Sequence, residues 1–266
     1  IFETIDEPVE VKDAKDAIEM PAIQGKLEFE HVTFSYEKGV EILKDVNFSV
    51  EPGKTIAFVG PTGAGKSTIV NLISRFYNVD SGRILIDGVD ISKVTLRSLR
   101  KQMGVMMQDS FIFGGTIMDN IRYGNKTATD EEVIRAAKTV CAHDFIMQME
   151  DGYQTQVNER GSRLSVGQRQ LISFARALLA DPAILILDEA TSSIDTETEI
   201  VLQEGLNHLL KGRTSFIIAH RLSTIQNADC IMYISDGGIA EAGTHEELLQ
   251  KHGKYYELYE AQYKSV

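Results

Sequence analysis

The fold is decided by one glycine-rich stretch, Gly60-Pro61-Thr62-Gly63-Ala64-Gly65-Lys66-Ser67-Thr68. The apolar run 55–59 precedes it and has the length and β-branched content of a buried strand. Apolar residues at helical spacing follow it, from Ile69 to Phe76. A strand, a glycine-rich turn and a helix are the setting in which the pattern G-x-x-x-x-G-K-[ST] binds phosphate. The sequence therefore predicts a nucleotide phosphate site in this turn.

The residue types in this turn suit that chemistry. Glycines let the backbone curl so that successive N–H groups point at an anion, and the new helix adds its positive N-terminal end. Lys66 supplies a full charge for the outer phosphates, and the Ser67 hydroxyl is a hard oxygen ligand for Mg²⁺. A chance glycine turn is the alternative, and the flanking strand and helix argue against it.

Bulk composition narrows the classes of function. The chain has 266 residues, 43% of them hydrophobic and 25% charged, as is ordinary for a soluble globular protein. A formal net charge of −12 repels nucleic acid, so DNA or RNA is disfavoured as the main partner. The two cysteines, Cys141 and Cys230, lie far apart without metal-ligand spacing, and we expect reduced thiols in a cytosolic compartment.

The start of the chain is expected to be a linker. No apolar run approaches the roughly 18 residues of a membrane-spanning helix. The chain begins at Ile1-Phe2-Glu3 without an initiator methionine, so we expect a fragment of a longer polypeptide. Residues 1–24 are acidic and contain Pro8 and Pro21, which is typical of a linker.

Hydrophobic patterns predict an α/β fold. Alternating residues over 26–36 and 45–50 predict an antiparallel β region of about 26–58. The continuous apolar run at 183–187 is typical of a buried parallel strand, and 213–219 predicts one more buried strand. We expect a largely parallel sheet with this N-terminal β subdomain and inserted helices. Helical patterns cover about 115–180, including 130–138, and about 245–263, while 96–100 predicts a short helix and 230–241 a hairpin.

Polar residues stand at the ends of three expected strands. Asp188 and Glu189 follow the run 183–187, where two adjacent carboxylates are costly to place without a purpose. Asp188 can hold Mg²⁺ through water, and Glu189 can polarise the water that attacks a γ-phosphate. Gln108 and His220 end two further strands, at the edge where open α/β sheets bind ligands. A charged strand exit, a solvated amide and a backbone-satisfied imidazole are the ordinary alternatives.

Two further features have both a functional and a structural interpretation. A helix is expected to start near Ser165 or Gly167, and this second small-residue helix start could hold a second anion, although Ser and Gly are also ordinary capping residues. Tyr36 ends the first strand, where it could stack on a purine or simply pack across the sheet.

Together these stretches resemble the nucleotide-binding domain of an ATP-binding-cassette transporter over about residues 25–266. The resemblance rests on six motifs in order. Residues 60–67 match the Walker A loop, Gln108 the Q-loop, and Leu164-Ser165-Val166-Gly167-Gln168 the signature. Residues 184–188 with Glu189 match Walker B and its glutamate, Ser192-Ser193-Ile194-Asp195 the D-loop, and His220 the switch histidine. Tyr36 matches the adenine-stacking aromatic, and a signature shortly before Walker B singles out this family.

The resemblance implies a P-loop NTPase (RecA-like) core that binds ATP and Mg²⁺. It implies that two such domains dimerise head to tail, with residues 60–68 and Tyr36 of one chain and Ser165, Gly167, Gln168 and Asp195 of the other around each ATP. Lys66 and Gln108 then act on the phosphates and Mg²⁺, and Ser67 and Asp188 hold the metal. Glu189 is the general base, and His220 positions Glu189 or the γ-phosphate.

Exporters are the subgroup that the chain resembles most, of the multidrug or lipid type. Residues 113–121 and 159–161 resemble the segments that face the coupling helices of an exporter's membrane domain. That resemblance implies two partners, a transmembrane domain and a second nucleotide-binding domain, at the cytoplasmic face of the membrane. A nucleotide-gated module without efficient hydrolysis and a soluble cassette ATPase are the alternatives.

Val166 departs from the family, which usually has glycine there. A β-branched residue would crowd a nearby phosphate and disfavours positive φ. If Val166 weakens the signature, one of the two ATP sites of a dimer is impaired, as in heterodimeric exporters. Because valine is a mild change, a homodimer also fits the sequence.

Overall fold

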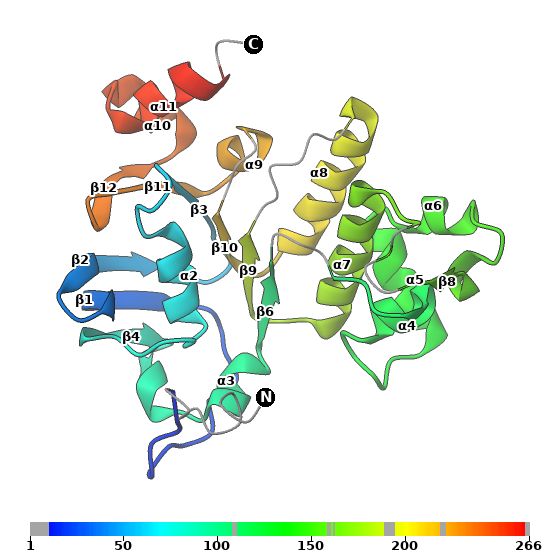
Figure 1. Cartoon of the computed structure of the whole chain (residues 1–266), viewed down its shortest axis with the longest axis horizontal. Coiled ribbons are helices and arrows are strands. Elements are labelled where there is room, and N and C mark those ends of the chain that lie inside the picture. The colour runs from blue at the N-terminus through cyan, green and yellow to red at the C-terminus, as the bar shows by residue number, and fades with distance from the viewer. Residues whose placement is uncertain are drawn as a thin grey trace. The chain divides into compact units, whose positions relative to one another are not determined.

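Figure 1 shows the computed structural model, which describes residues 11–107, 111–158, 161, 163–188, 195–218 and 222–263. The chain divides into two compact units. The first lies within Ile1–Pro52, Phe58–Met103 and Ile231–Val266, and the second within Gly53–Ala57 and Gly104–Cys230. No helix in the described ranges is both long and apolar enough to cross a lipid bilayer.

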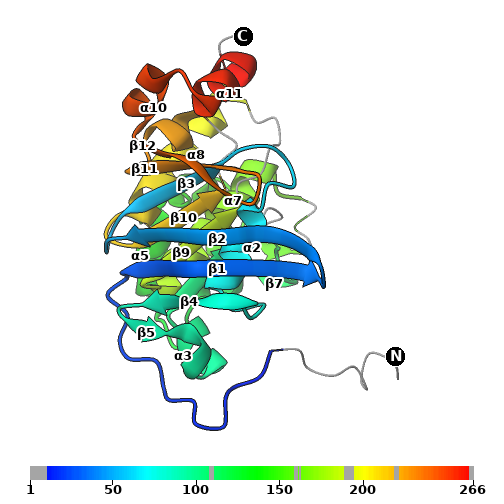
Figure 2. The same ribbon diagram turned by 90° about the vertical axis from the view of Figure 1, so that its left-hand side faces the viewer.

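An antiparallel sheet forms much of the first unit. Its strands follow the order β2-β1-β4-β5, and Figure 2 shows β2, β1 and β4 lying side by side. The alternating pattern of β1 buries one face of the strand. The strands are β1 (Leu27–Glu37), β2 (Val40–Val50), β4 (Ser81–Ile86) and β5 (Val89–Asp90).

Strand β2 begins five residues before the expected 45–50, since it starts at Val40. The sequence pattern misses this part because the ladder between β1 and β2 contains register shifts, which break the period of two. Asp45 takes a left-handed backbone with φ of 49°, as does His31 with φ of 52°, and the two side chains lie 2.7 Å apart. An irregular ladder therefore hides a long strand from pattern analysis.

Strand β3 (Thr55–Val59) and helix α2 (Lys66–Ile73) confirm the strand, turn and helix that the sequence predicts. The helix buries Ile69, Leu72 and Ile73 but ends before Phe76, which is exposed. It stops because Arg75 adopts a left-handed backbone with φ of 50°. The Arg100 guanidinium lies 5.0 Å from the centre of the Phe76 ring, which accounts for an aromatic residue at the surface.

The segment before β1 is bound along the first unit over much of the expected linker. Ile18 forms a parallel bridge to Val94. The Met20 N–H donates to Ser98 Oγ (2.8 Å), and the Ile23 N–H donates to Gln102 Oε1 (2.9 Å). These contacts reach a 3₁₀ turn (Ile91–Lys93) and the expected short helix, α3 (Leu96–Arg100). We name residues 12–23 the strap.

The C-terminal part of the first unit matches the expected hairpin and helices. Strands β11 and β12 pair in antiparallel, and helix α10 begins at a capping box in which Thr244 and Glu247 satisfy each other's backbone N–H groups. Tyr255 is buried and its hydroxyl contacts His245 Nδ1 at 2.7 Å. The elements are β11 (Cys230–Ser235), β12 (Gly238–Gly243), α10 (His245–Lys251) and α11 (Lys254–Tyr263).

The second unit is mainly helical over 115–180, as expected, with one small antiparallel ladder between β7 and β8. Helix α7 packs against α4, α5 and α8, as Figure 1 also shows. The elements in chain order are β7 (Gly115–Thr116), α4 (Ile117–Arg122), α5 (Asp130–Thr139), α6 (His143–Met147), a 3₁₀ turn (Gly152–Gln154), β8 (Gln156–Val157), α7 (Val166–Ala180), α8 (Thr196–Leu210) and α9 (Leu222–Gln226).

The remaining sheet is mixed, with mostly parallel strands. In the second unit its order is β3-β10-β9-β6, and in the first unit β3 is followed by β11 and β12. Strands β9 (Ile184–Asp188) and β10 (Thr214–Ile218) are parallel, and all of their residues except Asp188 are buried, as in a strand that is covered on both faces. Strand β6 (Met103–Met106) ends two residues before Gln108, which lies outside the described residues.

Candidate functional site

The glycine-rich turn takes a backbone that other residues would strain. Gly60, Gly63 and Gly65 have φ values of 135°, 80° and 107°. A Cβ on Gly60 would lie 2.2 Å from the Ile234 carbonyl oxygen, and one on Gly65 would lie 2.9 Å from Leu43 Cδ2. One side of the loop therefore packs closely against Ile234 and Leu43, and the other side, with Pro61, Thr62 and Gly63, is exposed. Such a turn directs backbone N–H groups toward an external acceptor.

Helix α2 begins without a side-chain cap. Its N-cap residue is Gly65, which has no side chain that could accept a hydrogen bond from the first-turn N–H groups. The first turn, all of it described, also contains no acidic residue. These N–H groups carry the positive end of the helix dipole, so an anion supplied from outside satisfies both the donors and the charge.

Lys66 brings a charge to this loop. Its Nζ donates to the carbonyl oxygens of Gly60 (2.7 Å) and Pro61 (2.9 Å), which holds the ammonium at the loop itself. Ser67 is exposed, so its hydroxyl oxygen can serve a metal ion, whereas Thr68 is buried. The residues that the sequence assigns to phosphate and metal on this side therefore stand at one helix end.

Tyr36 is joined to the same helix end. Its hydroxyl donates to Thr68 Oγ1 (3.2 Å), and its ring meets Phe34 and Tyr77 edge to face, at centroid distances of 4.9 and 5.1 Å. The side chain is still 47% exposed. Tyr36 thus packs across the sheet and also offers surface beside the phosphate loop, which is where an adenine would need an aromatic face. Sequence analysis did not identify Tyr77. Its position, an aromatic residue shortly after the end of the predicted helix, was the feature that could have indicated it.

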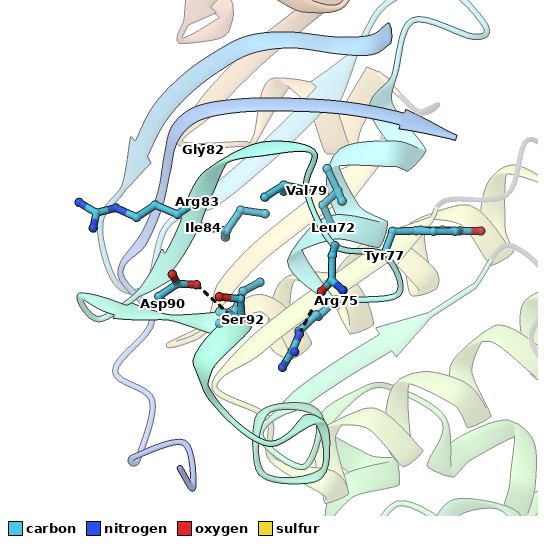
Figure 3. A pocket seen from close by; sticks show the side chains of 11 residues that line it. Leu72, Arg75, Tyr77, Val79, Gly82, Arg83, Ile84, Asp90 and Ser92 are labelled. Carbon is cyan, nitrogen blue, oxygen red and sulfur yellow. Dashed lines mark hydrogen bonds between the residues drawn. The ribbon is translucent and has the colours of Figure 1, made fainter. Parts of the chain in front are cut away.

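A cavity of about 190 Å³ lies beyond the other end of α2 (Figure 3). Tyr77 and Arg75 line it, and Arg75 is buried. The Arg75 guanidinium donates to the Val94 carbonyl (2.6 Å) and to the Lys12 carbonyl of the strap (3.2 Å). Burial lowers the pKa of Arg75. Because its two terminal nitrogens are bound to backbone carbonyls, Arg75 anchors the end of α2, a role that the sequence pattern did not indicate.

Asp188, the carboxylate that the sequence analysis expects to hold Mg²⁺, is the last residue of β9 and lies half-buried in the second unit. It pairs in register with Ile218, the last residue of β10. Glu189, His220 and Gln108 lie outside the described residues, as do Ser192, Ser193 and Ile194. Their expected roles therefore stay predictions.

Helix α7 starts in a different way from α2. Ser165 is its N-cap: Ser165 Oγ accepts from the Gln168 N–H (3.1 Å), and Gln168 Oε1 accepts from the Ser165 N–H (3.0 Å). This capping box decides between the two expected caps in favour of Ser165. Gly167 lies inside the helix, and a Cβ there would approach Thr198 Cγ2 to 2.3 Å, so glycine allows α7 and α8 to pack closely.

Val166 is the first residue of α7 and takes a helical backbone. The preference of a β-branched residue against positive φ is therefore no obstacle at this position, because a helical φ is negative and suits valine. Its side chain is partly exposed and does not pack inside the helix bundle.

Asp195 caps α8 by accepting from the Thr198 N–H (2.9 Å). That hydrogen bond, followed by one from the Thr198 hydroxyl, lowers the pKa of the Asp195 carboxyl.

Comparison with known proteins agrees with this geometry. The model of the ABC transporter family matches residues 43–192. An uncharacterized ABC transporter ATP-binding protein of Bacillus subtilis is 54% identical over 99% of this chain and 44% of its own length. A fatty acid ABC transporter ATP-binding/permease protein of Mycobacterium bovis is 50% identical over 97% of this chain and 41% of its own.

A solved structure of a bacterial Atm1-family ABC exporter with ATP bound has a TM-score of 0.90 and 44% identity, and it covers 98% of this chain and 46% of that one. The chain thus spans less than half the length of the relatives described here. The fold is the ABC ATPase fold, with its antiparallel β subdomain and mostly parallel mixed sheet. The match over more than half of the residues means that this chain belongs to the ABC transporter family.

Proposed function

We propose that this chain is the ATP-hydrolysing domain of an exporter. The observation that carries the proposal is the N-terminus of α2, which starts at a glycine, follows a strained glycine-rich turn and holds the Lys66 ammonium. Backbone donors, a helix dipole and one cation at a single point suit a triphosphate better than any other common ligand. Tyr36 adds an aromatic surface for the adenine beside it.

Each residue has a separate task in the proposed reaction. Lys66 and the loop N–H groups bind the phosphates and stabilise the charge that develops during transfer. Ser67 and Asp188 offer hard oxygen atoms for Mg²⁺, with Gln108 as a further ligand, and the bound ion would neutralise phosphate charge. Glu189 accepts the proton of the attacking water, and His220 positions Glu189 or the γ-phosphate.

A second nucleotide-binding domain completes the proposed site. Ser165, Gly167, Gln168 and Asp195 of one chain would face the ATP held by residues 60–68 of the other. Support comes from the start of α7, where the helical backbone leaves the Val166 side chain partly exposed and the Ser165 hydroxyl is held at the helix end. ATP would then keep the two domains together, and hydrolysis would release them.

A membrane domain is the other proposed partner. An exposed apolar surface supports it, because large exposed apolar patches mark interaction sites. The ring of Phe113 lies 5.0 Å from Phe111 and 4.5 Å from Tyr123, and Met107 is 60% exposed. We name Val105, Met107, Phe111, Phe113 and Tyr123 the docking patch. Relatives named as ATP-binding/permease proteins are more than twice as long as this chain, so the remaining length supplies a candidate for this surface.

Export at the cytoplasmic face of a membrane follows as part of the same proposal. ATP-driven closing of two such domains would move a membrane domain held at the docking patch between inward-facing and outward-facing states. The Atm1-family exporter with ATP bound is the solved structure that supports this assignment by likeness.

The test is phosphate release by the full-length transporter with Glu189→Gln. Loss of a general base should cut turnover by about 10²–10⁴-fold while ATP binding remains, as measured with a fluorescent nucleotide. Glu150→Gln, at an exposed position in the second unit, is the matched control and should leave turnover unchanged. Turnover near that of the wild type in Glu189→Gln would contradict the proposed role.

A further inference from the structure

Three aromatic rings meet beside helix α2 in the first unit. Phe34 and Tyr36 belong to β1, and Tyr77 follows the last residue of α2 by four positions. The centre of the Tyr36 ring lies 4.9 Å from that of Phe34 and 5.1 Å from that of Tyr77, with interplanar angles of 87° and 86°. Phe34 and Tyr77 are themselves 5.6 Å apart, so each ring meets the other two. Phe34 is buried, and Tyr36 is the ring with a large exposed surface.

Two contacts tie Tyr36 to α2, and they restrain different movements. The Tyr36 hydroxyl donates to Thr68 Oγ1 (3.2 Å) in the first turn of the helix. This hydrogen bond holds the tip of the side chain, but it lies near the axis about which a tyrosine ring turns, and that torsion has a broad energy minimum. The perpendicular ring of Tyr77, beyond the last turn, restrains the turn itself. Tyr77 and Phe34 together therefore set the plane of the Tyr36 ring.

The backbone just before Tyr77 is firmly held. The Arg100 guanidinium donates to the carbonyl oxygens of Ser74 (3.2 Å) and Arg75 (2.8 Å). Arg75 in turn donates to the Val94 carbonyl (2.6 Å), and in Figure 3 the Tyr77 side chain points away from that guanidinium. Tyr77 thus projects from a fixed turn, which suits a residue that has to hold another side chain in one orientation.

We propose that Tyr77 is a positioning residue for the base of ATP. Its ring sets the plane of Tyr36, and a base stacks well only on a ring that offers its face at the right angle. The inference rests on the proposed function, in which Tyr36 faces the adenine. It adds that Tyr77 acts on the base and not on the phosphates, because the Lys66 ammonium and the loop N–H groups lie at the opposite end of α2.

The experiment measures the binding of two ligands to the full-length transporter by isothermal titration calorimetry. ATP and inorganic triphosphate are used without Mg²⁺, so that no hydrolysis occurs, and the second ligand lacks the base. The variants are Tyr77→Leu, Tyr77→Phe and Tyr36→Ala. Phe76→Leu is the matched control, since Phe76 stands in the same turn but its ring lies against Arg100, at 5.0 Å.

Tyr77→Leu should weaken ATP binding by about two- to tenfold, the scale of one edge-to-face aromatic pair. Triphosphate affinity should stay at the wild-type value, which would also show that the phosphate site is folded. Tyr77→Phe and Phe76→Leu should bind ATP like the wild type, because both keep the ring at position 77. An equal loss for ATP and triphosphate, or a loss in Tyr77→Phe as large as in Tyr77→Leu, would overturn the proposal.

Tyr36→Ala separates this inference from the function on which it rests. Without the stacking ring, ATP affinity should fall by about 5- to 150-fold, and adding Tyr77→Leu should cause no further loss. A wild-type protein that binds neither ligand would refute the proposed function. Normal ATP affinity in Tyr36→Ala would refute stacking on Tyr36, and the role of Tyr77 with it. Weaker binding in Tyr36→Ala with normal binding in Tyr77→Leu would refute only the role of Tyr77.

Discussion

Two helices of this chain begin at small residues in family motifs, and they begin differently. Helix α2 starts at Gly65, in a left-handed backbone and without a side-chain cap. Helix α7 starts at Ser165, whose side chain and backbone form a reciprocal capping box with Gln168. The sequence assigns an anion to both helix starts, yet only α2 depends on an external acceptor for its first turn.

The difference explains which helix should bind a nucleotide alone. The capping box of α7 occupies the N–H groups of Ser165 and Gln168 with acceptors from the same chain. The start of α2 has the Lys66 ammonium beside it instead. We infer that α2 is a primary phosphate site, and that α7 meets a phosphate only when a second chain brings one to it.

The largest effect should come from Lys66→Ala. Hydrogen bonds to charged groups contribute about 1.5–3 kcal/mol, so ATP affinity should fall by roughly 10- to 150-fold. Isothermal titration calorimetry with ATP measures the loss. Lys101→Ala, at an exposed position of the same unit, is the control and should bind ATP normally. An unchanged ATP affinity of Lys66→Ala would contradict the inference that the start of α2 is a primary phosphate site.

Gly167→Ala should disturb α7 through packing. The added Cβ would meet Thr198 Cγ2 at 2.3 Å, so α7 and α8 must move apart, at a cost of about 1–3 kcal/mol in the free energy of unfolding. Urea denaturation measures this. Gly238→Ala is the matched control, since a Cβ there would meet nothing within 4 Å. Equal stability of the two variants would show that glycine at 167 is not required by helix packing.

Ser165→Ala should remove the cap of α7 and destabilise the domain by about 1 kcal/mol. ATP binding to a single chain should be unaffected, because the first turn of α2 does not use this side chain. Chemical denaturation and calorimetry on the same sample test both statements. Weaker ATP binding by the monomeric variant would mean that the two helix starts are not independent.

The smallest effect belongs to Val166→Gly. Both residues fit a helical backbone, and glycine has a lower helix propensity, so stability should fall by about 0.5 kcal/mol or less. A gain in stability would indicate that valine is strained at this position, contrary to the helical backbone of α7. Thermal unfolding of the two proteins side by side gives the answer.

Sequence reasoning correctly predicted the features that depend on residues close together in the chain. The turn before Lys66, the buried strands β9 and β10 and the capping box at Thr244 all follow from neighbouring residues. Their signals are a glycine pattern, a continuous apolar run and a pair of residues three positions apart. The same local signals gave Ser165 as one of two expected caps, and only the structure chose between them.

Sequence reasoning failed where contacts between residues far apart in the chain determine the structure. The strap is held by the Ser98 and Gln102 side chains, about 80 positions away, and no local pattern reports such contacts. Gly167 resembles a phosphate-binding glycine in sequence, but its demand for space comes from Thr198 on another helix. The polar residues that end the strands in the second unit, Glu189 and His220 among them, lie outside the described residues, so their roles rest on resemblance.

The account can be tested by recording backbone amide NMR shifts of the isotope-labelled chain as Mg²⁺-ATP is added at a concentration that keeps it monomeric. We predict that the amides of Lys66, Ser67 and Thr68 shift strongly, while those of Val166, Gly167 and Gln168 stay in place. Shifts confined to the start of α7, or no shifts at the start of α2, would contradict the account.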